Sequence, residues 1–198
     1  MKIIGVSCSP RKGKSTFYAL EACLQAAKEA VPEIKTRLIE LSDMKINGCV
    51  ACGKCMKVLE CSQEDDFEKC IPILSDSELA GMVVATPVYF GSMTSQGKAF
   101  LDRCVMFRRN GFLLKDKVGG VIAVGGVRNG GQELTIQAVQ AAMLVQDMIV
   151  VSEGKPTSHY GATLWSNHPD GIEKDTFGLE TAQNLGKRVA EVAKRMHG

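Results

Sequence analysis

The sequence predicts an α/β fold in which helices cover both faces of a parallel sheet, a doubly wound arrangement. Short runs rich in β-branched residues recur along the 198 residues, and stretches with helical periodicity separate them. Several runs are apolar nearly throughout, as expected for strands covered on both faces. A chain of this length can bury one core, so we expect a single domain over residues 1–198, with a cysteine-rich insertion at about 43–70.

Five runs are the predicted strands, at residues 2–7, 35–41, 81–87, 118–126 and 147–153. Strand–helix–strand units with right-handed crossovers make these strands parallel. Five such strands favour the order 2-1-3-4-5 of a flavodoxin-like three-layer sandwich. In sheets of this kind ligands bind beyond the carboxyl ends of the strands, here the first, third and fourth.

Apolar residues at helical spacing predict the helices between these strands. The first helix groups Phe17, Leu20, Leu24, Ala27 and Val31; the second Phe100, Cys104 and Phe107; the third Ile136, Val139, Met143 and Leu144. A last helix over about 177–196 groups Leu179, Ala182, Leu185, Val189, Val192 and Met196. Residues 43–70 and 152–175 do not fit the alternation, and long insertions of this kind are usually functional or mobile.

The composition argues against several classes of protein. The chain has 24 Lys and Arg against 22 Asp and Glu, a formal charge of +2 without long like-charge runs. This balance gives no sign of nucleic-acid or membrane-surface binding. The sequence shows no signal peptide, and its apolar runs are shorter than the roughly 20 residues of a membrane span. We therefore expect a cytoplasmic protein, in which the eight cysteines are thiols or metal ligands more often than disulfides.

The loop after the first strand, CSPRKGKST at residues 8–16, has the features of an anion site. Its GKST ending is similar to a nucleotide P-loop, but Cys8 stands where that motif requires a glycine. A helix that begins after a buried strand offers free N–H groups and a favourable dipole to an anion. The candidate phosphate ligands are Ser9, Arg11, Ser15 and Thr16. The alternative is a helix cap next to a solvated arginine.

Two further loops at the same predicted sheet edge suit a flat aromatic ligand. The loop after the third strand has an aromatic pair flanked by Gly and Ser, which can hold a ring between π-faces and backbone. The glycines of the loop after the fourth strand allow main-chain N–H groups to approach a heterocycle closely. The candidate ring contacts are Pro87, Val88, Tyr89, Phe90, Gly91, Ser92, Gly126, Arg128, Gly130 and Gly131.

The three loops resemble the FMN-binding loops of the NADPH-dependent FMN reductase superfamily, and more narrowly of its iron-sulfur flavoprotein branch. The resemblance extends from the first strand to HYGA at residues 159–162. It implies that the first loop holds the FMN phosphate, that the other two frame the isoalloxazine, and that His159 lies near the flavin. Arg128 would then stabilise reduced, anionic FMN, unless it is a solvated loop charge. The first loop departs from the family pattern at Cys8, Lys14 and Ser15, changes with which FMN binding is compatible.

Four cysteines are concentrated in GCVACGKCMKVLEC at residues 48–61: Cys49, Cys52, Cys55 and Cys61. The residues alone leave open an iron-sulfur cluster, a zinc site, a disulfide staple or a redox dithiol. Zinc sites with four thiolates usually have two separated CxxC pairs, whereas cysteines at successive three-residue steps suit a cubane. The resemblance implies one [4Fe-4S] cluster, with Cys70 as an alternative fourth ligand. Cys23 and Cys104 are predicted core residues, and Cys8 is predicted to be structural.

The resemblance predicts an electron-transfer oxidoreductase that contains FMN and a [4Fe-4S] cluster. Such cofactors carry the redox chemistry, so no side chain need act as a general base. The expected donor is ferredoxin or NAD(P)H, and the expected acceptor is a small molecule such as dioxygen, hydrogen peroxide or a quinone. The alternatives are an NAD(P)H-dependent FMN or quinone reductase without a functional cluster, and a non-enzymatic carrier or redox sensor. The resemblance also implies a homodimer or homotetramer.

Overall fold

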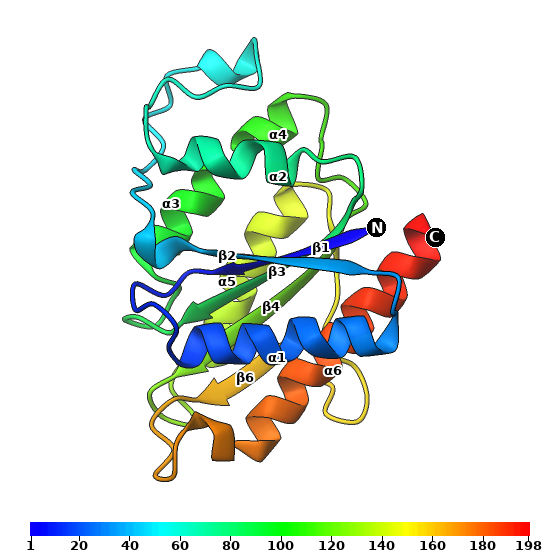
Figure 1. Ribbon diagram of the computed structural model, residues 1–198. Helices are drawn as coiled ribbons and strands as arrows, with labels where there is room; N and C mark the ends of the chain where they lie inside the picture. The colour runs from blue at the N-terminus through cyan, green and yellow to red at the C-terminus, as the bar shows by residue number, and fades with distance from the viewer.

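The computed structural model describes all residues 1–198 as a parallel sheet between two layers of helices (Figure 1). Its strands are β1 (Lys2–Ser7), β2 (Lys35–Glu40), β3 (Leu79–Pro87), β4 (Val118–Gly125), β5 (Ile149–Val150) and β6 (Ala162–Trp165). The order is β2-β1-β3-β4-β5, and every pair is parallel. The predicted fold class and strand order are therefore confirmed.

The last position of the sheet differs from the prediction, which placed one strand at 147–153. The structure has only the two-residue β5 there, paired with the start of β4. After a loop the chain returns as β6 and pairs with the end of β4, where Ile122 faces Ala162. Because β6 lies inside the polar segment predicted as an insertion, only the pairing with β4 reveals it as a strand.

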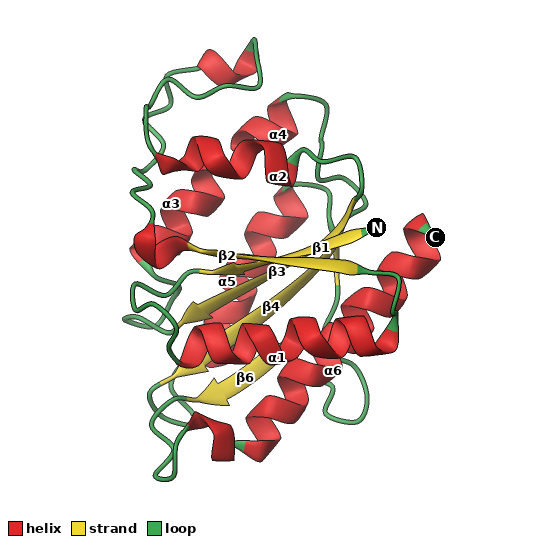
Figure 2. Ribbon diagram, in the orientation of Figure 1, coloured by secondary structure: helices red, strands yellow, loops and turns green.

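The helices divide into two layers, as Figure 2 shows. One face of the sheet is covered by α1 (Ser15–Ala30) and α6 (Thr176–His197). The other is covered by α2 (Ile71–Leu74), α3 (Ser95–Arg103), α4 (Val105–Arg109) and α5 (Gln132–Val145). Short 3₁₀ turns occur at Leu41–Asp43, Lys54–Met56, Asp66–Cys70 and Ile172–Lys174.

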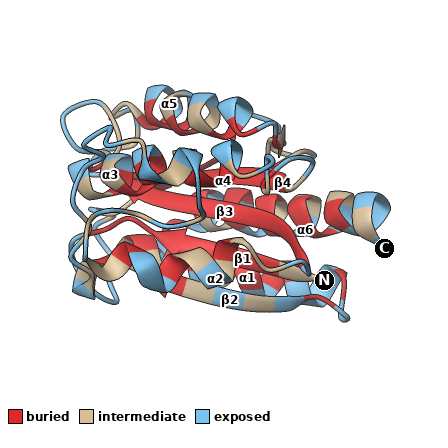
Figure 3. Cartoon of the chain, turned by 90° about the horizontal axis from the view of Figure 1, so that it is seen from above, coloured by how far each residue is buried: buried red, intermediate tan, exposed pale blue.

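The central strand β3 is buried along its whole length, as Figure 3 shows between the helical layers. Its successive side chains alternate between the two cores: Met82 and Val84 pack with the α3–α5 layer, and Val83 with the α1–α6 layer. Such burial on both faces explains why this strand is a continuous apolar run in the sequence. It holds the loop that follows it at a fixed place on the sheet edge.

Two predicted helical faces are only partly correct. The predicted continuity of Phe100 and Phe107 in one helix is interrupted at Cys104, where α3 ends and α4 begins. Leu144 and Met196, expected on core faces, are exposed, and each lies in the last turn of its helix. No helix has both the length and the apolar character needed to cross a membrane.

Candidate functional site

The three predicted flavin loops leave the sheet at one edge. β1, β3 and β4 are neighbours in the sheet and all run in parallel, so their carboxyl ends lie side by side (Figure 1). Backbone hydrogen bonds continue beyond the strands: Cys8 N–H donates to Ala85 O at 2.8 Å, and Val88 N–H donates to Val124 O at 2.9 Å. The sheet thus places residues 8–16, 87–92 and 126–131 next to one another, as the sequence predicts.

The first loop leaves the N-terminus of α1 open to a ligand. Lys14, the residue at the N-cap position, provides no side-chain cap, and the first turn has no acidic residue. The first N–H groups of α1 are therefore without a capping side chain, which suits a phosphate. Ser9 is buried, and its Oγ accepts a hydrogen bond from Arg11 N–H at 3.1 Å. Arg11 is exposed and Thr16 is buried at the helix start.

Thr94 ties this loop to helix α3. Its Oγ1 donates to Cys8 O at 2.7 Å and accepts from Gly97 N–H at 3.0 Å, capping the helix. A Cβ added to Gly97 would lie 3.0 Å from Cys8 Cβ, so the helix and the loop are in close contact. Sequence reasoning gave Thr94 no role, although a threonine before a helical stretch is a recognisable N-cap signal.

The aromatic pair of the second loop lies on a tight turn. Tyr89 and Ser92 exchange two backbone hydrogen bonds of 2.8 and 3.1 Å. The residues between them, Phe90 and Gly91, both have positive φ, at 51° and 80°. This geometry projects the Phe90 ring into solvent, where it is fully exposed. The turn presents an aromatic face at the sheet edge that the rest of the chain does not cover.

Gln132 organises the third loop from within. Its buried amide accepts a hydrogen bond from Gly130 N–H at 2.7 Å and donates one to Val127 O at 2.6 Å. Gly131 of the third loop lies close to Val88 of the second loop, since a Cβ added to Gly131 would lie 3.6 Å from Val88 Cγ1. The second and third loops therefore meet at Gly131, as a shared ring site requires. Sequence reasoning missed Gln132, and no pattern in the sequence reveals it.

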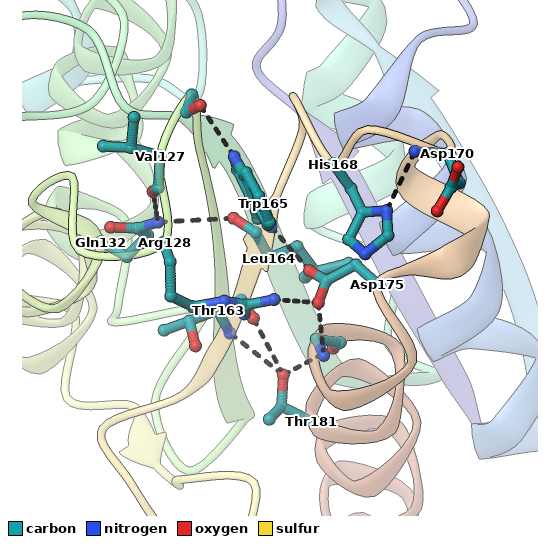
Figure 4. A network of polar contacts seen from close by, with 12 residues as sticks. Val127, Arg128, Gln132, Thr163, Leu164, Trp165, His168, Asp170, Asp175 and Thr181 are labelled. Atoms are coloured by element: carbon teal, nitrogen blue, oxygen red, sulfur yellow. Dashed lines mark hydrogen bonds and ion pairs between the residues drawn. The ribbon is translucent and has the colours of Figure 1, made fainter.

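Arg128 pairs with the buried carboxylate of Asp175, at the start of α6 (Figure 4). The same carboxylate accepts hydrogen bonds from Trp165 N–H at 2.7 Å and from Gly178 N–H at 3.2 Å. The Trp165 indole N–H donates to Gly126 O at 3.0 Å. Asp175 and Trp165, neither predicted, thus link the third loop to β6 and α6. The ion pair directs one nitrogen of Arg128 toward Asp175, so a role toward flavin stays a prediction.

A cavity of about 390 Å³ adjoins the third loop and is lined by Arg128, Gly131, Thr163 and His159, among others. His159 Nδ1 lies 3.1 Å from Oε1 of Glu153, whose carboxylate is fully buried. This contact fixes the orientation of the imidazole ring at the cavity wall. Since Gly131 lines the cavity and also touches the second loop, the structure brings His159 close to the predicted flavin loops.

The four clustered cysteines surround a second, narrow cavity. Cys49, Cys52, Cys55 and Cys61 all line it, together with Arg103 and Arg109. Ser62 Oγ donates a hydrogen bond to Cys52 Sγ at 2.9 Å. This bond and a backbone hydrogen bond from Lys54 lower the pKa of the Cys52 thiol. A lower thiol pKa favours the thiolate, the form that binds metals.

The other cysteines are buried away from this cavity. Cys8, Cys23, Cys70 and Cys104 are all core residues. Burial raises the pKa of Cys70 to about 11, and that of Cys8 to about 12. The predicted structural roles of Cys8, Cys23 and Cys104 are confirmed. The alternative of Cys70 as a ligand finds no support, because its thiol belongs to the buried core that includes Phe67 and Phe100 and does not line the cavity.

A buried ion pair anchors the cysteine-rich segment to α3. Arg103 donates from both terminal nitrogens to Asp65, at 2.9 and 3.1 Å, and from Nη1 to Asn47 O at 3.1 Å. At the other end of the helix, the Gln96 amide donates to Leu41 O and Met44 O. Sequence reasoning missed these anchors, because a buried arginine at a helix end has no distinctive pattern.

The fold and the loops at one sheet edge define a flavodoxin-like protein of the flavin-dependent oxidoreductase class. The chain belongs to the NADPH-dependent FMN reductase family, whose sequence profile matches residues 1–163. This result confirms the resemblance that the loop sequences indicate.

Relatives and solved structures agree with this placement. The chain is 43% identical over 195 residues to an iron-sulfur flavoprotein of Methanocaldococcus jannaschii, covering 98% of both chains. It is 39% identical over 192 residues to an iron-sulfur flavoprotein of Methanosarcina thermophila, covering 97% of this chain and 95% of the other. A flavone reductase has a TM-score of 0.73 at 21% identity, with 98% of this chain and 63% of that one covered. A WrbA-like flavodoxin from Agrobacterium tumefaciens has a TM-score of 0.68 at 19% identity, covering 98% of each chain. These two structures show the fold.

Proposed function

We propose that this chain is an iron-sulfur flavoprotein, an oxidoreductase that uses FMN and one [4Fe-4S] cluster to pass electrons from ferredoxin or NAD(P)H to a small acceptor. Curated relatives that share nearly its whole length carry the name iron-sulfur flavoprotein. The observation that carries the proposal is the cavity lined by Cys49, Cys52, Cys55 and Cys61. Four thiols from one segment line it, whereas the remaining four cysteines are buried elsewhere.

The thiols suit a cluster better than a single ion. Three of the cysteines follow at successive three-residue steps, which suits the corners of a cubane, whereas zinc sites with four thiolates usually have two separated CxxC pairs. The thiols line a cavity of about 20 Å³ in the exposed segment at 48–61, none of whose residues is buried.

The FMN site has donors for each part of that cofactor. The uncapped N-terminus of α1 and the exposed Arg11 guanidinium suit the phosphate. The Tyr89–Ser92 turn and the glycines at 126, 130 and 131 suit the isoalloxazine, since they meet at Gly131. When bound, FMN supplies two-electron uptake with one-electron release, and the cluster supplies single-electron transfer. The role of the side chains is to bind and orient these groups.

Tests on the purified protein identify its cofactors, its electron donor and its electron acceptor. Anaerobic purification should give protein with flavin, iron and acid-labile sulfide, the last two near four per chain. Turnover with reduced ferredoxin is compared with turnover with NADH and NADPH, for dioxygen, hydrogen peroxide and a quinone as acceptors. Rapid oxidation of NAD(P)H by protein that contains flavin but no iron would contradict the proposal and favour an FMN or quinone reductase.

A further inference from the structure

Two arginines reach the cavity between the thiols from the helices behind it. Arg103 is the last residue of α3, and Arg109 the last residue of α4. Both line the cavity together with the four cysteines. No carboxylate lines this cavity. Both guanidinium groups thus lie at the cavity with the thiols, and Arg103 is in addition paired with the buried carboxylate of Asp65.

Arg103 has one donor that the rest of the chain does not use. Its guanidinium is almost completely buried, and its terminal nitrogens bind Asp65 and Asn47 O. Its Nε–H is buried and has no hydrogen-bond partner. Cys61 lines the same cavity as this guanidinium.

Arg109 contacts a different thiol directly. Its Nη1 donates a hydrogen bond to Cys55 Sγ at 3.2 Å. The neighbouring Asn110 donates from Nδ2 to Cys55 O at 2.9 Å, so side chain and backbone of this cysteine are both held. Arg109 is exposed, and its partner is a sulfur atom instead of a carboxylate. Its removal should therefore leave the fold intact.

We propose that Arg109 is a positioning residue of the cluster site, which holds Cys55 and, with the Arg103 guanidinium at the same cavity, stabilises the reduced state of the bound cluster. The inference rests on the proposed function. Hydrogen bonds to the sulfurs and the local net charge are among the factors that set the potential of an iron-sulfur cluster. Reduction adds one electron, with no bond formed or broken, and so increases the negative charge between four thiolates. The Arg109 cation, which has no carboxylate partner, favours that state.

The test is the midpoint potential of the cluster, measured by an anaerobic titration followed by electron paramagnetic resonance. Arg109→Gln removes the charge and keeps a polar side chain, whereas Arg109→Lys keeps the charge. We expect Arg109→Gln to shift the oxidised-to-reduced ratio at a fixed potential about tenfold toward the oxidised form, about 59 mV for one electron. Arg109→Lys should show a smaller shift.

Arg108→Gln is the matched control. Arg108 is the preceding residue on α4, but its guanidinium packs over the Phe112 ring, 5.4 Å from the centroid. Removing it changes the net charge as Arg109→Gln does, without removing a hydrogen bond to sulfur. The midpoint potential of Arg108→Gln should differ from that of wild type by only a small fraction of the shift seen in Arg109→Gln. An equal shift in both variants would mean that only overall charge matters, and would overturn the proposal.

Arg103→Lys tests the second arginine. It keeps the charge opposite Asp65 but lacks an Nε donor, so we expect weaker iron retention and an altered resonance spectrum. Should this variant fail to fold, the comparison of Arg109→Gln with Arg108→Gln still tests the proposal. A wild-type potential in Arg109→Gln would overturn the inference and leave the proposed function intact. Wild-type protein that binds no iron or sulfide would overturn both.

Discussion

The flavin edge and the cysteine segment differ in how they are held in place. The flavin edge, residues 8–16, 87–92 and 126–131, follows strands whose residues are almost all buried. In the cysteine segment, residues 44–63, no residue is buried, and its one regular element is a short 3₁₀ turn. The sheet therefore organises the flavin edge before any ligand binds. The cysteine segment depends on a few side chains of α3 and α4, and on the metal it binds.

The largest expected effect is the loss of iron, which the cysteine segment binds and the flavin edge does not. Cys61→Ala removes a cavity thiol, and we expect a loss of nearly all cluster iron with flavin content unchanged. Cys70→Ala is the control: that thiol lies in the core, so iron should be retained while the protein loses about 1 kcal/mol of stability from the small cavity. Iron, sulfide and flavin analysis checks both variants. Iron loss in Cys70→Ala and retention in Cys61→Ala would reassign the fourth ligand.

The next effect breaks the anchor of the cysteine segment. Asp65→Asn leaves the buried Arg103 without its counter-ion, and breaking a buried pair costs about 3–5 kcal/mol. We expect faster loss of iron and a lower unfolding midpoint, while FMN binding persists in the folded fraction. Asp102→Asn is the matched control, since that pair with Lys98 is solvent-exposed on both sides and contributes under about 1 kcal/mol. Equal denaturation curves for the two variants would refute the anchoring role.

The same ion pair predicts a dependence on pH. Burial acts to raise the pKa of Asp65, but hydrogen bonds from Arg103, Asn47 N–H and Phe67 N–H outweigh it and hold the pKa below its ordinary value of 3.8. The folded state therefore binds fewer protons at this site, and the pair stabilises the protein fully above the ordinary value. This stability is lost as the pH falls below it. Denaturation of wild type and Asp65→Asn between pH 3 and pH 6 measures the free energy of unfolding of each. The difference between the two free energies should become smaller toward pH 3.

A smaller effect concerns the phosphate part of the flavin edge. Arg11→Ala removes an exposed cation next to the uncapped N-terminus of α1. A hydrogen bond to a charged group contributes about 1.5–3 kcal/mol, so FMN should bind about ten to a hundred times more weakly. Riboflavin, which lacks the phosphate, should bind both proteins alike. Fluorescence titration of the apoprotein measures these affinities, and an equal loss for riboflavin would place Arg11 elsewhere in the site.

The smallest effect concerns the exposed aromatic turn. Phe90 contacts solvent on all sides, so Phe90→Ala should change the free energy of unfolding by less than about 0.5 kcal/mol. If the ring covers the isoalloxazine, its loss should weaken FMN binding by about 1 kcal/mol. Thermal unfolding and flavin titration of the same variant separate the two quantities. Unchanged FMN affinity would remove Phe90 from the flavin site.

The sequence predicts the sheet and the flavin edge well, because their signals are local. Apolar runs of β-branched residues become strands when both faces are covered, and β1, β3 and β4 meet this condition. The position of the loops after those strands, at one edge of the sheet, follows from the parallel topology alone. The strand beside β4 at the edge of the sheet is not predicted by an apolar run. β6 contains the polar Thr163, and it is a strand only because β4 offers a free edge.

The sequence by itself determined the doubly wound order, the three loops at one edge and the four clustered cysteines with their spacing. Only the tertiary structure decided what supports them. Arg103 and Asp65, Gln132, and Arg128 with Asp175 form contacts between residues far apart in the chain. Local patterns report which backbone a segment prefers. They do not report which distant polar group will satisfy a buried charge or amide, because that partner is chosen by the packing of elements from the whole chain.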